Sequence, residues 1–149
     1  MLPNLKVLFL CTGNSCRSQM AEGWVRHLHP GRMEACSAGI APGRLDPRAV
    51  AVMAEAGVDI SGQRAKGVSQ VLEVPLDLVV TVCDHAQETC PVFPGRVRLM
   101  HRSFEDPPRL ATSARTEEEA LDHYRRVRDE IRVFVEDLAG LLAAEESAE

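Results

Sequence analysis

The sequence predicts an α/β domain in which helices cover both faces of a four-stranded parallel sheet. Four short apolar runs are rich in residues that favour strands. The segments between them carry apolar residues three and four positions apart, which is the spacing of amphipathic helices. Strands that alternate with helices form parallel sheets with helices on both sides. Because 149 residues suit one core, we expect a single three-layer sandwich domain over residues 1–149, with a frayed tail at about 143–149.

The first half of the chain predicts two units of strand and helix. Residues 7–10 are consecutive apolar residues, typical of a strand buried on both faces, and this strand ends at Cys11. Residues 33–38 predict a second strand. Asp46 followed by Pro47 predicts the N-cap and the first position of a helix after it. The helix between the two strands has an apolar face formed by Met20, Ala21, Trp24, Val25 and Leu28.

The second half of the chain predicts the other two strands. Residues 76–82 form the third apolar run, and it ends at Cys83. A short helix is expected before it, at about residues 69–73, and residues 97–100 form the fourth strand. A second cysteine is therefore expected at the exit of a central strand.

The C-terminal part predicts a rigid loop and then a long helix. Prolines stiffen residues 103–108. Thr116 and Glu119 have the spacing of a capping box, which predicts the start of the helix. We interpret its apolar face as core contacts, formed by Leu121, Tyr124, Val127, Ile131, Val135, Leu138 and Leu142.

Composition excludes several classes of protein. A net charge of −5 and an aromatic share of 4% leave no basic or stacking surface for nucleic acid. No apolar run is long enough to cross a bilayer and no signal segment precedes the first strand, so we expect a cytoplasmic protein with no membrane partner. Five cysteines in such a chain indicate catalysis, redox chemistry or metal binding in preference to a disulfide framework. No pair has the Cys-x2-Cys spacing, and we expect no metal site. We also expect a monomer with no bound cofactor.

The segment between the first strand and the first helix carries Cys11, five residues, Arg17 and then Ser18. In this arrangement the loop amides and the first N–H groups of the helix point toward one spot, which suits an oxyanion. The same positive field favours the thiolate of Cys11 over its thiol. Arg17 can hold two oxygens of a tetrahedral oxyanion at once, and Gly13 permits unusual backbone angles. Ser18 can donate its hydroxyl to the Cys11 sulfur. The pattern predicts a nucleophilic thiolate in an oxyanion-binding loop, and a buried cysteine before an ordinary helix is the weaker interpretation.

Two further features lie near the same edge of the predicted sheet. Cys83 follows a strand, as Cys11 does, so both cysteines are expected where ligands bind such sheets. Cys90 lies seven positions after Cys83, and the two can close a small loop if the turn between them loosens, or they can be packed thiols. Asp106 precedes a proline, which suits either a general acid aimed at the cleft or an ordinary turn residue. The residues alone leave both choices open.

Residues 11–18, Cys-Thr-Gly-Asn-Ser-Cys-Arg-Ser, resemble the phosphate-binding loop of the low-molecular-weight protein tyrosine phosphatase superfamily. Residues 19–23 and 80–83, together with the Cys-Pro pair at 90–91, are similar to its thioredoxin-coupled arsenate reductases. The similarity covers nearly the whole chain and implies a low-molecular-weight phosphatase-like fold. It also implies that an oxyanion is bound by Thr12, Gly13, Asn14, Ser15, Cys16, Arg17 and Ser18.

The resemblance implies that the protein reduces arsenate to arsenite in arsenic detoxification. Cys11 would attack arsenate held by Arg17, and Asp106 would protonate the departing oxygen. Cys83 would then attack Cys11, and Cys90 would attack Cys83, in a disulfide relay. Thioredoxin would reset the relay with electrons from NADPH by way of thioredoxin reductase. Arsenate and thioredoxin are the partners that the resemblance implies.

The alternative function is that of a low-molecular-weight protein tyrosine phosphatase acting through a phosphocysteine at Cys11. Some phosphatase side activity is expected in either case, because phosphate and arsenate are similar tetrahedral anions. Pro108 departs from the phosphatase pattern, which has an aromatic residue there to stack on phosphotyrosine. A third class, an oxyanion-binding or redox-sensing module without turnover, would not need Asp106.

The resemblance also raises the question of a potassium ion. Several reductases of this kind bind potassium near the loop through an Asn, a Ser, a Thr and an Asp. Asn14 and Ser37 match the first two, but Arg64 and Lys66 stand at the other two positions. Cationic side chains repel a cation, so our hypothesis is that Lys66 or Arg64 replaces the ion.

Overall fold

The computed structural model describes the backbone of residues 4–148 and the side chains of residues 4–142. The strands form one sheet in the order β2-β1-β3-β4, and every neighbouring pair is parallel. The predicted four-stranded parallel sheet is therefore confirmed. The strands are β1 (Leu5–Cys11), β2 (Met33–Gly39), β3 (Leu78–Thr81) and β4 (Arg98–His101).

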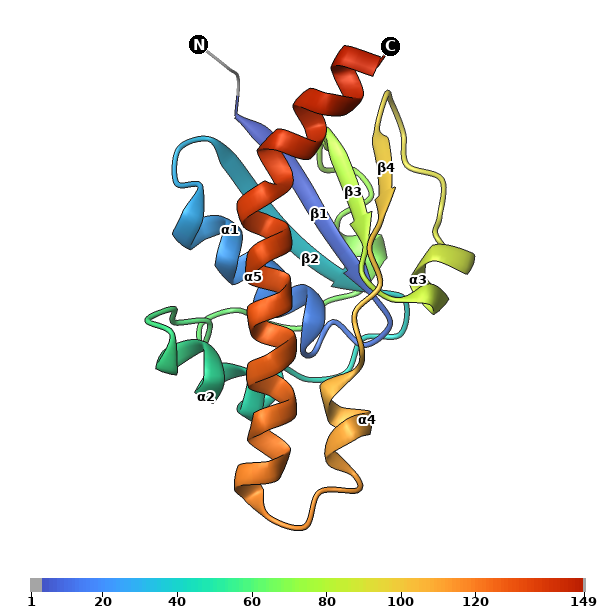
Figure 1. Ribbon diagram of the computed structural model, residues 1–149. Helices are drawn as coiled ribbons and strands as arrows, with labels where there is room; N and C mark the ends of the chain where they lie inside the picture. Colours follow the sequence, from blue (N-terminus) through green and yellow to red (C-terminus); the bar gives the residue numbers. More distant parts are fainter. Residues whose placement is uncertain (1–3, 149) are drawn as a thin grey trace.

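Helices lie against this sheet as the alternation of strands and helices predicted. In Figure 1, α1 and α5 lie together over one face of the sheet, and the segment that contains η1 lies behind it. All four residues from Val7 to Leu10 in the central strand β1 are fully buried, which requires cover on both faces. The helices are α1 (Arg17–Leu28), α2 (Pro47–Glu55), η1 (Val68–Gln70, a 3₁₀-helix), α3 (Asp84–Glu88), α4 (Pro107–Ala111) and α5 (Glu117–Ala148).

The long helix α5 closes the core, as its apolar spacing predicted. Tyr124, Ile131 and Leu138 are at most 1% exposed, and α5 packs against α1, α2 and α4. The Trp24 indole of α1 donates a hydrogen bond to the carbonyl oxygen of Arg128, at 3.1 Å. The predicted capping box is present in part: the Glu119 N–H donates to Thr116 Oγ1, at 3.1 Å.

Two short elements differ from the sequence prediction. A helix was expected at 69–73, but η1 spans Val68–Gln70 and is followed by turns in which Val74 N–H donates to the Val71 carbonyl, three residues back. Gly67 and Pro75 bound this segment, leaving little length for an α-helix. The loop predicted at 103–108 contains the start of α4, because two prolines suit the first positions of a helix.

The C-terminal end extends beyond the predicted core. Helix α5 continues to Ala148, so the backbone of the expected frayed tail at 143–149 is helical as far as that residue. The side chains from 143 onward, and residue 149, lie outside the described residues. Within the described part of the chain, no helix combines the length and apolar character that crossing a membrane requires.

Gly23 of α1 lies against Met53 of α2 and against the segment after α2. A Cβ added at Gly23 would lie 2.6 Å from Ile60 Cγ2 and 3.2 Å from Met53 Cε. Both of those side chains are fully buried and have little room to move.

We expect Gly23→Ala to lower the free energy of unfolding by about 1–3 kcal/mol, because overpacking outweighs the helix propensity of alanine. Gly140→Ala in α5 is the control, since a Cβ there meets nothing within 4 Å. The control should raise the free energy of unfolding, by up to about 1 kcal/mol. Urea denaturation measures both values, and equal effects at the two glycines would contradict the packing argument.

Candidate active site

Cys11, the last residue of β1, lies at the base of the loop that leads into α1. Its side chain is buried, and two groups of the loop contact its sulfur. The Asn14 N–H donates to Cys11 Sγ at 3.2 Å, and Ser18 Oγ lies 2.9 Å from the same sulfur. Ser18 Oγ also accepts a hydrogen bond from the Asn14 side-chain amide, at 2.9 Å. The Ser18 hydroxyl hydrogen is therefore left to donate to Cys11, and both donors are placed to hydrogen-bond to its sulfur.

The loop turns its carbonyl groups away from Cys11. The carbonyls of Thr12, Gly13 and Ser15 accept hydrogen bonds of 2.8, 2.9 and 2.9 Å from backbone N–H groups of residues 41, 43 and 46. In a trans peptide the next N–H points opposite to the carbonyl. The N–H groups of the loop are thus directed toward the side where Cys11 lies, as that of Asn14 demonstrates. Such a set of converging N–H groups suits an oxyanion.

The unusual backbone angle of the loop belongs to Asn14 and not to Gly13, where we expected it. Asn14 has φ of 50°, the left-handed region that only a few residue types other than glycine tolerate. Its side chain is fully buried, and its Oδ1 accepts hydrogen bonds from the Lys66 N–H at 2.9 Å and from Gln19 Nε2 at 3.1 Å. These bonds hold Asn14 in the conformation that aims its N–H at Cys11.

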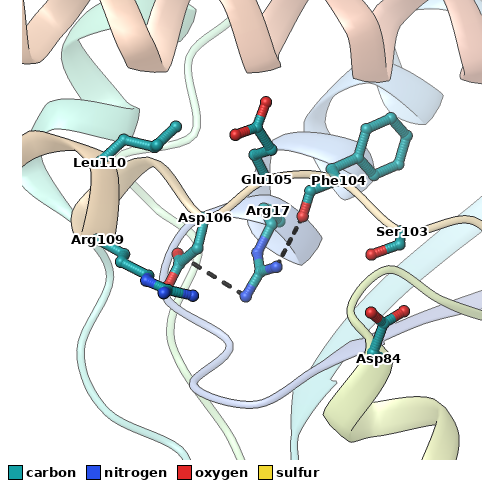
Figure 2. Close-up of a pocket in the computed structure, with 8 residues that line it drawn as sticks. All are labelled: Arg17, Asp84, Ser103, Phe104, Glu105, Asp106, Arg109 and Leu110. Carbon is teal, nitrogen blue, oxygen red and sulfur yellow. Dashed lines mark hydrogen bonds and ion pairs between the residues drawn. The ribbon is translucent and has the colours of Figure 1, made fainter.

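Arg17, the first residue of α1, reaches across the cleft in front of the loop. One terminal nitrogen donates to the Phe104 carbonyl at 2.9 Å, and the other lies 3.7 Å from Asp106 Oδ1. Figure 2 shows Arg17 and Asp106 facing each other across this cavity of about 560 Å³. The second nitrogen is only loosely held, so the guanidinium can turn to an oxyanion. The cavity is lined by Arg17, Asp84, Ser103, Phe104, Glu105, Asp106, Arg109 and Leu110.

Asp106 is the N-cap of α4, yet its carboxylate makes no capping hydrogen bond. Pro107 and Pro108 occupy the first two positions of the helix, and proline has no N–H to donate. The carboxylate therefore stays free to face Arg17 and the cavity. This geometry suits a general acid better than a turn residue.

Cys83 lies beside the loop, as its position at a strand exit predicted. Its sulfur is 3.4 Å from Thr12 Oγ1 and accepts a hydrogen bond of 3.4 Å from the Ala86 N–H as the N-cap of α3. Its side chain is 5% exposed, so a movement is needed before it can react with a large partner. A second thiol thus lies against the loop that begins at Cys11.

Cys90 lies beyond the far end of α3, away from the other two cysteines. It borders a separate cavity of about 190 Å³ that is also lined by Thr81, Gln87, Leu99, Met100 and His101. Burial raises the pKa of its thiol. The structure therefore brings Cys11 and Cys83 to one edge of the sheet but keeps Cys90 apart from them.

The low molecular weight phosphotyrosine protein phosphatase family matches residues 6–148 of this chain. The chain belongs to this family. The arsenate reductase of Halalkalibacterium halodurans is 47% identical over 129 residues, which are 86% of this chain and 91% of that protein. The arsenate reductase of Bacillus subtilis is 45% identical over 130 residues, which are 87% and 91% of the two chains.

Solved structures of the family share this fold. An arsenate reductase in an oxidised state has a TM-score of 0.75 and 32% identity, over 89% of this chain and 95% of the other. A low molecular weight protein tyrosine phosphatase from T. tengcongensis has a TM-score of 0.72 and 28% identity, over 92% and 99% of the two chains. The fold is common to both activities, so the choice between them depends on individual side chains.

Cys16 lies in the loop of the family but differs from Cys11 in its surroundings. Burial raises the pKa of the Cys16 thiol well above its ordinary value, and the carboxylates of Asp46 and Asp106 add to the effect. A protonated thiol is a weak nucleophile. Cys16 therefore suits a structural role in the loop and not that of a nucleophile.

A buried polar cluster beneath the loop was missed in part by the sequence prediction. Glu22 of α1 is 2% exposed, accepts from Ser37 Oγ at 2.8 Å and pairs with Arg26 at 2.7 Å. Gln19 is fully buried and donates to the Asn14 and Arg64 carbonyls, both at 2.9 Å. The signal available in the sequence was a pair of polar residues on the otherwise apolar face of the first helix.

The Lys66 ammonium, and not the Arg64 guanidinium, approaches Glu22, whose carboxylate also binds Ser37, a residue that the resemblance implied for a potassium ion. Lys66 Nζ lies 3.8 Å from Glu22 Oε1 and donates to the Arg64 carbonyl at 3.3 Å. The Arg64 side chain instead turns to Gln70. An ammonium group already lies against the buried carboxylate, so these residues do not fit a further cation. Among the described residues no cluster of His, Cys, Asp or Glu could hold a metal ion.

We expect Lys66→Met to lower the free energy of unfolding by about 1–3 kcal/mol, because it leaves the buried Glu22 carboxylate with one charged partner, the exposed Arg26. Lys6→Met is the matched control, since the Lys6 ammonium has no ion pair with any described residue, and it should change the value by no more than about 0.5 kcal/mol. Chemical denaturation compares the two variants.

Potassium should leave the steady-state rate of the unaltered protein unchanged, because Lys66 already supplies the positive charge. A titration of potassium chloride against sodium chloride at constant ionic strength measures this. Strong activation by potassium would overturn the hypothesis that the Lys66 ammonium replaces the ion.

Proposed function

We propose that this protein is an arsenate reductase that converts arsenate to arsenite with the thiols of Cys11, Cys83 and Cys90. The observation that carries the proposal is the contact of 3.4 Å between Cys83 Sγ and Thr12 Oγ1, which puts a second thiol against the loop of the first. Phosphate ester hydrolysis needs one thiol and water, and a reduction by thiols needs two electrons from two thiols. The arsenate reductase activity named for relatives at 45% and 47% identity supports the same conclusion.

In the first step the Cys11 thiolate attacks the arsenic atom of arsenate. The N–H groups of the loop and the Arg17 guanidinium hold the other oxygens as their charge changes. Asp106 gives its proton to the departing oxygen, which leaves as water. The product is a covalent adduct with a bond between Cys11 Sγ and arsenic(V).

In the second step the Cys83 thiolate attacks Cys11 Sγ. The bond between sulfur and arsenic breaks, and its electron pair stays with arsenic, which leaves as arsenite. The two sulfurs have given up two electrons and share a Cys11–Cys83 disulfide. Thr12 Oγ1, beside Cys83, is placed to donate a hydrogen bond to the attacking thiolate.

In the third step the Cys90 thiolate attacks Cys83 and releases Cys11 as a thiolate. A disulfide needs the two Cα atoms within about 7 Å, whereas seven residues of an α-helix span about 10 Å, so α3 must unwind. A dithiol of the thioredoxin class then reduces the Cys83–Cys90 disulfide, with NADPH as the source of electrons through thioredoxin reductase. All five cysteines are free in the structure, which suits the reducing cytoplasm. We propose that the protein acts there as a monomer in arsenic detoxification.

A phosphatase remains the second candidate, because the loop of Cys11 and Arg17 suits phosphate esters equally well. The cavity is less suited to an aryl group. Its one aromatic lining residue among those described is Phe104, which is 4% exposed and packs edge-on against Phe134 of α5. We therefore expect aryl phosphate hydrolysis only as a weak side activity.

Cys83→Ser and Cys90→Ser should each abolish arsenate turnover and leave aryl phosphate hydrolysis within about twofold of the parent, because only the reduction uses the relay. NADPH consumption with thioredoxin, thioredoxin reductase and arsenate measures the first activity, and nitrophenyl phosphate hydrolysis measures the second. Cys36→Ser is the control and should retain both activities. Full arsenate turnover in both relay variants would leave a phosphatase as the better description.

Asp106→Asn should slow the Cys11 step by about 10²–10⁴-fold, because an amide cannot protonate the departing oxygen. Glu105→Gln is the control in the same cavity, since its carboxylate pairs with Arg126 at 3.1 Å and not with Arg17. Single-turnover kinetics on aryl phosphate measure both. A rate for Asp106→Asn equal to that of the control would overturn the assignment of Asp106 as the general acid.

A further inference from the structure

His101, the last residue of β4, joins three elements through its ring. Its Nε2 lies 3.0 Å from Asp84 Oδ1, at the start of α3. Its Nδ1 lies 2.7 Å from Thr81 Oγ1, at the end of β3. The carboxylate requires a proton on Nε2, and the Thr81 hydroxyl then donates to Nδ1, so a neutral ring satisfies both bonds. One imidazole thus ties the ends of two strands to the first residue of the helix between Cys83 and Cys90.

The bond between Asp84 and His101 also lies between two cavities. Asp84 lines the cleft of Arg17 and Asp106, and Figure 2 shows it at the start of α3. His101 lines the separate cavity that Cys90 borders. The pair therefore separates the cleft of the proposed chemistry from the third thiol of the relay.

Few other contacts hold α3 in place. The helix spans only Asp84–Glu88, and Ala86 is its one buried residue. At its start Cys83 Sγ accepts from the Ala86 N–H, at 3.4 Å, and at its end Thr89 Oγ1 donates to the His85 carbonyl, at 2.7 Å. Neither of these bonds reaches another element. Among the described side chains of α3, only the Asp84 carboxylate is hydrogen-bonded to the sheet.

We propose that the Asp84–His101 hydrogen bond is a latch that keeps α3 folded and Cys90 away from Cys83 until the relay needs it. Asp84 and His101 are positioning residues, and neither reacts. The inference rests on the proposed function, since it concerns the exchange of Cys83 with Cys90. A latched helix keeps Cys83 as a free thiol beside Thr12, ready for Cys11, and disfavours its pairing with Cys90 when an external disulfide is present as oxidant.

The latch changes the equilibrium between the dithiol and the disulfide. It exists when α3 is folded, and α3 must unwind for the Cys83–Cys90 disulfide, so the bond stabilises the dithiol form alone. Removing it should favour the disulfide. For an exposed pair of this kind we expect about a threefold shift in the equilibrium constant, which makes the reduction potential about 14 mV more negative.

The experiment uses the full chain with Cys11, Cys16 and Cys36 replaced by serine, so that only Cys83 and Cys90 can react. The protein is equilibrated in buffers of reduced and oxidised dithiothreitol, then alkylated and weighed by mass spectrometry. The two thiols lose two electrons and two protons, and oxidised dithiothreitol takes up both to become the dithiol. The variants are Asp84→Ala, His101→Ala, the two combined, and His85→Ala as a control on the same helix.

Each single variant should shift the equilibrium about threefold toward the disulfide. The combined variant should shift it no further, because the second change removes a bond that is already lost. His85→Ala should leave it unchanged, since the His85 ring is exposed and makes no hydrogen bond with any described residue. Hydrogen exchange of the amides of residues 86–90 in the dithiol form should be faster by a similar factor in the latch variants only.

The outcomes distinguish this inference from the proposed function. A disulfide that forms with the same potential in His85→Ala, Asp84→Ala and His101→Ala would overturn the latch and leave the relay intact. Additive shifts in the combined variant would also overturn it, because the two side chains would then act separately. No Cys83–Cys90 disulfide in the parent at any buffer ratio would overturn the relay of the proposed function, and the latch with it.

Discussion

The direction of the peptide groups between β1 and α1 is the constraint on which the rest of the site depends. Hydrogen bonds from residues 41–46 hold the loop carbonyls outward, so that the loop N–H groups converge on one side. The close approach of β2 is part of the same arrangement, because a Cβ at Gly39 would lie 2.7 Å from the Thr12 carbonyl oxygen. Glycine at the end of β2 is therefore what allows the loop to lie against that strand.

A fully bonded polar layer supports the strained point of this loop. Asn14 has a left-handed backbone, which costs about 1–3 kcal/mol for a residue other than glycine, and such a conformation lasts only where its surroundings require it. Its side-chain and backbone oxygens are engaged by Gln19 and by the backbone of Lys66. The Glu22 carboxylate, below the loop, is also fully bonded, since every buried polar atom among the described side chains has a partner. Bonded in this way, buried polar groups stabilise one loop conformation and are not a source of instability.

The proposed chemistry is divided between a rigid part and a movable part of the sheet edge. Cys11 follows the central strand and is held by the loop, where a fixed geometry is useful for binding an oxyanion. Cys83 and Cys90 flank a short helix with one buried residue, which is the kind of segment that opens locally at low free energy. Oxyanion binding at Cys11 thus takes place on a rigid loop. The exchange between Cys83 and Cys90, which needs a larger movement, takes place across a helix that can unwind.

The sequence by itself determined the alternation of strands and helices, the parallel sheet and the placement of two cysteines at one edge. Apolar spacing encodes these features, because strand exits of a parallel sheet must meet on one side. It also indicated Cys11 and Arg17, since both lie within one short stretch. These are local patterns, and short-range rules are enough to read them.

The tertiary structure alone decided which side chains meet across the fold. Lys66 reaches Glu22, and Asp84 reaches His101, over sequence separations that no local pattern records. The left-handed angle fell on Asn14 and not on Gly13, because distant groups satisfy the Asn14 side chain. Each of these contacts depends on the register of the strands and on the close packing of the helices against them, and these exist only once the chain has folded.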